Sequence, residues 1–192
     1  MTPKVDFRYS WVYDEKFKKK TADYPSEKTI LNYINKVKKL WAIHESKILN
    51  ELSKISGLKW KEKKIVCYII SRGYPFSDPL TIPIFERYPL WFIDTLTHEL
   101  IHQLFIQKGN EERAKKSWNF FYKKYKKESR TTRIHIPLHA IHSHIYLKFF
   151  DRKRLEKDIK IMSRHKDYKR SWGIVKKEGY QNIINEFKNR LK

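Results

Sequence analysis

Residues 90–106 read LWFIDTLTHELIHQLFI, and this stretch decides which fold the chain can form. Apolar residues dominate it on both sides of a short polar centre, so we expect a helix buried in the core. Pro89 suits the first turn of a helix, where its missing amide hydrogen is not needed, and Gly109 is a typical stop signal. The sequence therefore predicts a buried helix from about Pro89 to Lys108.

The segments around this helix predict a mostly helical chain with a small sheet. Residues 65–70 form a run of β-branched and aromatic side chains, which is typical of a buried strand. Residues 80–84 contain Pro83, which cannot donate an amide to a central ladder, so we expect an edge strand there. Further helices are expected over about 26–57, 110–127 and 137–162, and in two pieces of the tail divided by Gly179. The predicted fold class is α+β, mostly helical.

Length and composition narrow the classes of protein further. The chain has 192 residues and a formal net charge of +22, from 43 Lys and Arg against 21 Asp and Glu. This length favours a single domain over residues 1–192. No run reaches the roughly 20 apolar residues of a membrane span, the N-terminus lacks a secretory signal, and Cys67 is the only cysteine. We therefore expect a cytoplasmic protein without membrane contact, whose charge attracts nucleic acid nonspecifically.

The centre of the predicted helix reads His98-Glu99-Leu100-Ile101-His102, a complete H-E-x-x-H motif. Residues four apart lie one above the other on a helix, so both imidazoles can reach one metal ion. Glu99 projects beside that ion, where its carboxylate can take a proton from a bound water. Zinc makes this chemistry accessible because it lowers the pKa of its water from 15.7 to about 7. His98 and His102 are thus candidate Zn²⁺ ligands and Glu99 a candidate catalytic residue.

On these five residues the chain resembles the zincin superfamily of metallopeptidases. The resemblance implies a core in which a small sheet, with an edge strand that holds an extended peptide, lies over the active-site helix. It does not extend to a subfamily, because the metzincin pattern needs a histidine at position 108, which is Lys108. The thermolysin-like spacing needs a glutamate near position 121, which is Phe121. The chain is thus identified as a small, single-domain zincin-like protein of unassigned subfamily.

A catalytic zinc site has three protein ligands, so the sequence must supply one more. Residues 135–144 contain four of the eight histidines. We favour His139, in the first turn of a helix that would begin at Pro137, beside the small Ala140. His142 is the alternative from the same helix. Glu111 or Glu112 is the alternative from the helix that begins near Asn110, although acidic residues are common in a first helical turn for electrostatic reasons alone.

Two functional hypotheses follow from these observations. The first is a zinc-dependent hydrolase, most simply a peptidase acting on a peptide or protein substrate, with Glu99 as general base. In that case a substrate strand can add to residues 80–84. The second is a basic, nucleic-acid-associated binding protein in which the metal motif is structural or inactive, although no known DNA- or RNA-binding motif appears in the sequence.

Overall fold

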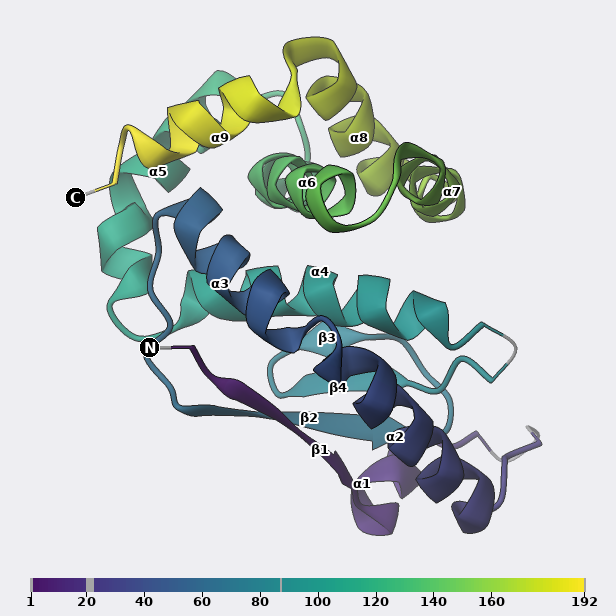
Figure 1. Ribbon diagram of the computed structural model, residues 1–192. Coiled ribbons are helices and arrows are strands. Elements are labelled where there is room, and N and C mark those ends of the chain that lie inside the picture. The colour runs from purple at the N-terminus through teal and green to yellow at the C-terminus, as the bar shows by residue number, and fades with distance from the viewer. Residues whose placement is uncertain (1, 20–22, 87, 192) are drawn as a thin grey trace. The chain divides into compact units, whose positions relative to one another are not determined.

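The computed structural model of the protein describes residues 2–19, 23–86 and 88–191 (Figure 1). The chain divides into two compact units, which are described separately below. The first comprises the described residues of Met1–Leu49 and Trp60–Gln103, and the second those of Asn50–Lys59 and Leu104–Lys192. That residues 1–192 form a single domain stays a prediction.

The order of the elements bears out an α+β fold that is mostly helical, with one small mixed sheet. The first unit contains β1 (Lys4–Tyr9), α1 (Trp11–Glu15), α2 (Glu27–Ala42), β2 (Lys64–Ile70), β3 (Phe76–Ser77) and β4 (Leu80–Pro83). Two helices have residues in both units, α3 (Glu45–Ser56) and α4 (Leu90–Ile106). The second unit adds α5 (Asn110–Lys124), α6 (Arg130–Phe149), α7 (Arg152–Met162), α8 (Lys166–Glu178) and α9 (Tyr180–Lys188). Within the described residues, no helix has both the length and the apolar character that crossing a bilayer requires.

The sheet has the strand order β1-β2-β4-β3, in which only the β3–β4 pair is antiparallel. The prediction that residues 80–84 form an edge strand was therefore wrong, because Thr81 pairs with Tyr68 of β2 on one side and Phe76 of β3 on the other. Pro83 is tolerated because it ends the strand, and the next amide, that of Ile84, donates to a β2 carbonyl at 3.0 Å. The short strand β3 is an edge of the sheet instead.

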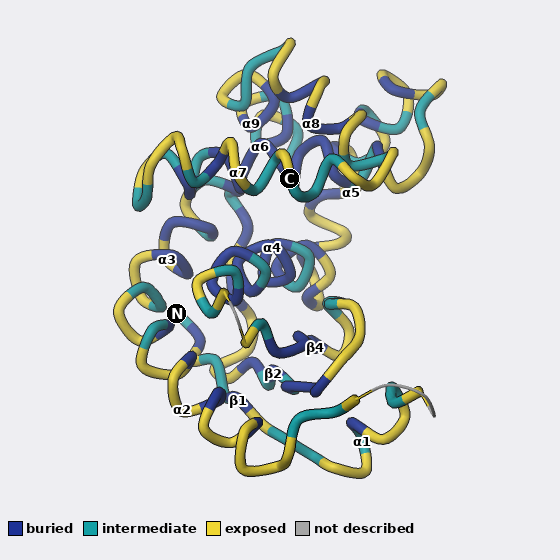
Figure 2. The backbone as a smooth tube through the Cα atoms, turned by 90° about the vertical axis from the view of Figure 1, so that its right-hand side faces the viewer, coloured by how far each residue is buried: buried dark blue, intermediate teal, exposed yellow. Residues whose placement is uncertain are grey.

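The two faces of the sheet follow from the period of two along β2. Ile65, Cys67 and Ile69 are buried and share one face, and Phe7 of β1, which pairs with Cys67, packs on Phe92 of α4 with ring centroids 5.5 Å apart. Tyr68 lies on the opposite face, where the ring of Tyr13 from α1 is 4.9 Å away. Figures 1 and 2 show the same layers, with α4 on one side of β2 and β4 and α1 on the other. The H-E-x-x-H helix thus lies directly on the sheet.

Helix α2 ends at Ala42, although the hydrophobic period of the sequence continues to Gly57. The predicted helix over 26–57 is therefore two helices. The carboxylate of Glu45, the first residue of α3, accepts hydrogen bonds from the Val5 amide of β1 at 2.7 Å and from the Trp41 indole at 3.1 Å. These bonds hold the turn between the two helices. The bond to β1 joins residues that are far apart in the sequence, so the hydrophobic period of the sequence does not predict it.

Helix α6 is the most buried element of the second unit and packs against α7, α8 and α9 (Figure 1). It begins at Arg130, not at Pro137 as predicted, because the hydroxyl of Ser129 accepts the Thr132 amide as an N-cap at 3.0 Å. Pro137 lies inside the helix, where it removes only one backbone hydrogen bond. The earlier start places His135 on the helix, one turn before His139.

The remaining element predictions were confirmed in outline. The strand predicted over residues 65–70 is β2, the helix predicted from Pro89 is α4, and Gly179 divides the tail into α8 and α9.

The prediction of one helix over 137–162 was wrong. Helix α6 ends at Phe149, and Asp151 caps a separate helix, α7.

The carboxylate of Asp14 yields a stability prediction for the first unit. It is fully buried and accepts the amide of Ser71 at 2.7 Å and the Ser71 hydroxyl at 2.9 Å. Asp14→Ala leaves both donors buried without this acceptor, so we expect a loss of about 2–3 kcal/mol in the free energy of unfolding. Urea denaturation measures it.

Asp6→Ala is the matched control for this experiment. It removes a partly exposed carboxylate that pairs with Arg8 and Lys64 at the surface, and it should cost less than about 1 kcal/mol. Equal losses in the two variants would contradict the structural role assigned to Asp14.

Candidate metal centre

The two histidines of the H-E-x-x-H motif lie on one face of α4, as their spacing predicts. Their ring centroids are 5.2 Å apart, and the rings meet edge to face. His98 is buried, with 6% of its surface exposed, whereas His102 is partly exposed. A face of α4 therefore offers two imidazoles one helical turn apart, one of them reachable from solvent.

Glu99 follows His98 in the sequence, and its side chain is buried, with 6% of its surface exposed. Among the described residues, no hydrogen bond or ion pair to its carboxylate is found. Burial alone raises its pKa to about 8. Burial, and to a smaller extent the charge of Glu99, raises the pKa of the Cys67 thiol in β2. A carboxylate in such surroundings is either protonated or compensated by a cation.

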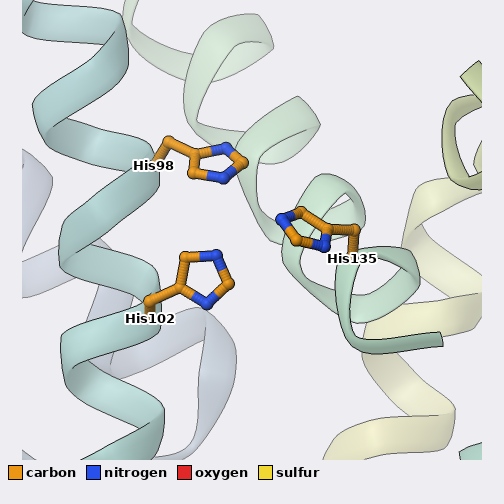
Figure 3. A group of neighbouring side chains, drawn as sticks. All are labelled: His98, His102 and His135. Carbon is orange, nitrogen blue, oxygen red and sulfur yellow. The ribbon is translucent and has the colours of Figure 1, made fainter. Parts of the chain in front are cut away.

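A third histidine, His135 of α6, joins the two motif histidines in one group (Figure 3). Each of the three rings offers one nitrogen, and these nitrogens all lie within 4.8 Å of one another. His98 and His135 are buried and His102 is of intermediate exposure, so two of the three rings are shielded from solvent and one is accessible.

The surroundings of His135 within α6 fix which of its nitrogens can act as a ligand. Its Nδ1–H donates a hydrogen bond of 2.8 Å to the backbone carbonyl of Thr131, so Nε2 carries the lone pair. The ring of Tyr168 packs beside it, with centroids 4.4 Å apart. Burial lowers the pKa of His135, which favours the neutral form that metals bind. This is the arrangement in which proteins commonly hold a metal-ligating imidazole.

His139, the ligand favoured by the sequence, lies outside this group and has a different environment. It is fully buried, and its ring is stacked flat on that of Trp172, with centroids 3.9 Å apart and an interplanar angle of 5°. Its Nδ1 shares a hydrogen bond of 2.8 Å with the hydroxyl of Ser171. Sequence reasoning passed over His135 because a helix that begins at Pro137 leaves that residue outside the helix. The signal that could have found it is Ser129, which with Thr132 marks an earlier helix start.

The other candidate ligands are also placed by the structure. His142 is buried on α6, and its ring lies 4.7 Å from that of Tyr146. Glu111 and Glu112 lie exposed in the first turn of α5, where Glu112 faces Lys115 at 3.9 Å. Among the described residues, the only candidate metal-binding group of histidine, cysteine or acidic side chains is the one formed by the two motif histidines and His135.

Comparisons of the chain with protein-family models, with curated proteins and with solved structures found no match. What this site does must therefore be inferred from its own residues and their chemistry.

The buried imidazole of His142 yields a prediction about pH. Burial, and to a smaller extent the charge of Arg154, lowers its pKa to about 3. The ring should therefore stay neutral in the folded protein down to about pH 4, whereas in the unfolded chain it gains a proton near pH 6.5. Because the unfolded state binds this proton first, the contribution of His142 to stability is present above about pH 6.5 and declines as the pH falls.

Nitrogen chemical shifts of the histidine rings, followed by NMR from pH 8 to 4, measure this directly. The His142 signal, identified by its loss in His142→Phe, should not move in the folded protein and should titrate in urea-unfolded chain. A folded-state midpoint near pH 6.5 would contradict the burial of this ring.

Proposed function

We propose that the protein is a zinc-dependent hydrolase, most simply a peptidase, in which His98, His102 and His135 bind Zn²⁺ and Glu99 is the general base. The observation that carries this proposal is the meeting of three imidazole nitrogens beside a helix whose buried carboxylate has no partner among the described residues. His139, favoured by the sequence as third ligand, is replaced by His135 in this proposal.

The residues present fit zinc in number and in chemistry. Three neutral histidines and one open position are the usual donor set of a catalytic zinc site. Three nitrogens that bind zinc tetrahedrally at about 2.0–2.1 Å are about 3.4 Å from one another. The nitrogens of the group lie within 4.8 Å of one another, so binding would draw them closer together. The hydrogen bond from His135 to Thr131 holds one ring in the tautomer that this requires.

Bound zinc supplies acidification of a water molecule and polarisation of a substrate carbonyl. With a metal held there, the carboxylate of Glu99 would take a proton from the water that attacks the substrate carbonyl carbon. Glu99 would then give the proton to the leaving amine nitrogen as the C–N bond breaks, so that the carboxylate is ionised again at the end. Its burial excludes bulk water, and a nearby cation is the condition under which a buried carboxylate is ionised before the reaction.

The substrate class follows from the zincin resemblance and from the sheet. An extended peptide would add to the edge strand β3, not to residues 80–84 as the sequence predicted. The side chain of Gln103 on α4, next to His102, donates a hydrogen bond to the backbone carbonyl of Ser77 in β3. This bond couples the edge strand to the motif helix within the first unit. The buried, single thiol of Cys67 suits our proposal of a cytoplasmic location.

The identity of the third ligand is tested by elemental analysis of protein purified without added zinc. We expect about one zinc per wild-type chain, and loss of most of it in His102→Ala and His135→Ala, because each removes one of three ligands. His139→Phe, which keeps an aromatic ring on Trp172, should retain the zinc. Circular dichroism checks that each variant is folded.

Two results would contradict this assignment. Metal-free wild-type protein would overturn the site as a whole. Zinc retained in His135→Ala and lost in His139→Phe would instead assign the third ligand to His139.

The role of Glu99 is tested by separating zinc binding from hydrolysis. Glu99→Gln keeps the size of the side chain but cannot accept the proton, so we expect cleavage of a casein or peptide-library substrate to fall by about 10²–10⁴-fold. The zinc content should stay at the wild-type level. A Glu99→Gln variant that cleaves at the wild-type rate would rule out this mechanism, and a zinc-containing wild type without hydrolytic activity would favour a structural metal.

A further inference from the structure

A second surface of the first unit, made by residues that the metal centre does not use, has its own chemistry. We propose that this surface binds single-stranded nucleic acid, with bases stacked on exposed aromatic rings and phosphates beside lysine and arginine side chains. Two adjoining pockets form it, and both are lined by Arg72. We call it the Arg72 surface and define it by Lys16, Lys19, Arg72, Tyr74, Tyr88 and Trp91.

The larger pocket has a volume of about 750 Å³. All of the charged residues that line it are basic, and several aromatic residues line it as well. No acidic side chain of the described residues lines it. Lys18 is paired with Glu15 at 3.0 Å, whereas the described residues offer no carboxylate partner to Lys16 or Lys19. The two lysines therefore leave uncompensated positive charge at this pocket.

Aromatic rings beside these charges are exposed to an unusual degree. Tyr74, on the rim of the larger pocket, has 81% of its surface exposed, the highest value among the large hydrophobic side chains described. The smaller pocket, of about 420 Å³, presents Tyr88, which is 51% exposed and stacked on Trp91 with ring centroids 4.4 Å apart. Neighbouring exposed rings rimmed by charged side chains are typical of surfaces that bind a partner.

Arg72 lines both pockets and adds a further basic side chain beside the aromatic rings. Its guanidinium is exposed and reaches Glu86 at 3.2 Å, a surface pair that contributes little and that a phosphate can replace. Single-stranded nucleic acid fits such a surface because its bases offer flat faces to tyrosine and tryptophan while its phosphates follow the cations. An acidic peptide would use the same lysines but has no set of flat rings to match Tyr74 and Tyr88. The net charge of +22 adds long-range attraction for a polyanion.

Fluorescence anisotropy with a labelled, mixed-sequence DNA strand of about 12 nucleotides tests this proposal. Tyr74→Ala and Tyr88→Ala should each weaken binding about fivefold or more, because each removes a stacking platform. Tyr74→Phe keeps the ring and should bind as the wild type does. Lys19→Ala should reduce the salt dependence of binding, whereas Lys153→Ala, an exposed lysine of α7 in the second unit, should not.

Two further measurements distinguish base stacking from attraction by charge alone, and this surface from the proposed hydrolase site. Polyglutamate peptide of equal charge should compete weakly, and Glu99→Gln should bind the strand as tightly as the wild type. Equal binding by Tyr74→Ala and Tyr74→Phe, or competition by polyglutamate as strong as that by unlabelled DNA, would overturn the proposal. Because neither outcome depends on zinc or on hydrolysis, failure here and failure of the proposed function are distinguishable.

Discussion

The burial of one carboxylate, that of Glu99, limits what the H-E-x-x-H helix can do. An ionised carboxylate removed from water is destabilising by several kcal/mol unless a partner compensates it. The described residues supply none, and burial raises the pKa of Glu99 to about 8. If Glu99 had only a structural role, an apolar side chain at this buried position would stabilise the fold more than a carboxylate does. Glu99 is therefore either protonated at neutral pH or compensated by a cation. We propose that a cation held by His98 and His102 of α4 compensates it.

The proposed ligands come from that helix and from α6, and each helix is fixed by contacts within one unit. Packing of α4 on β1 and β2 fixes the direction of the motif residues, through contacts such as that of Phe92 with Phe7. In α6 the hydrogen bond between His135 and the Thr131 carbonyl fixes a ring nitrogen as acceptor. We propose that these contacts orient the ligand rings in advance, so that the rings lose little conformational freedom when a metal binds.

The sequence was sufficient for the features that local pattern encodes and insufficient for those that depend on long-range contacts. The apolar run of α4, the motif spacing and strand β2 could all be predicted. The position of β4 inside the sheet could not, because the pairing of Thr81 with Phe76 is decided by a hairpin of only two paired residues on each side. His135 was missed because Pro137 was interpreted as a helix start, although one missing backbone hydrogen bond is tolerated inside a well-packed helix.

X-ray absorption spectroscopy at the zinc edge would count and identify the atoms around the proposed metal in the folded protein. We expect three imidazole nitrogens and one oxygen at about 2.0–2.1 Å, with the outer-shell scattering of three rings. His135→Ala should leave two rings in whatever zinc remains. A sulfur neighbour at about 2.3 Å, or a shell of four imidazoles with no oxygen, would contradict a three-histidine centre with an open position.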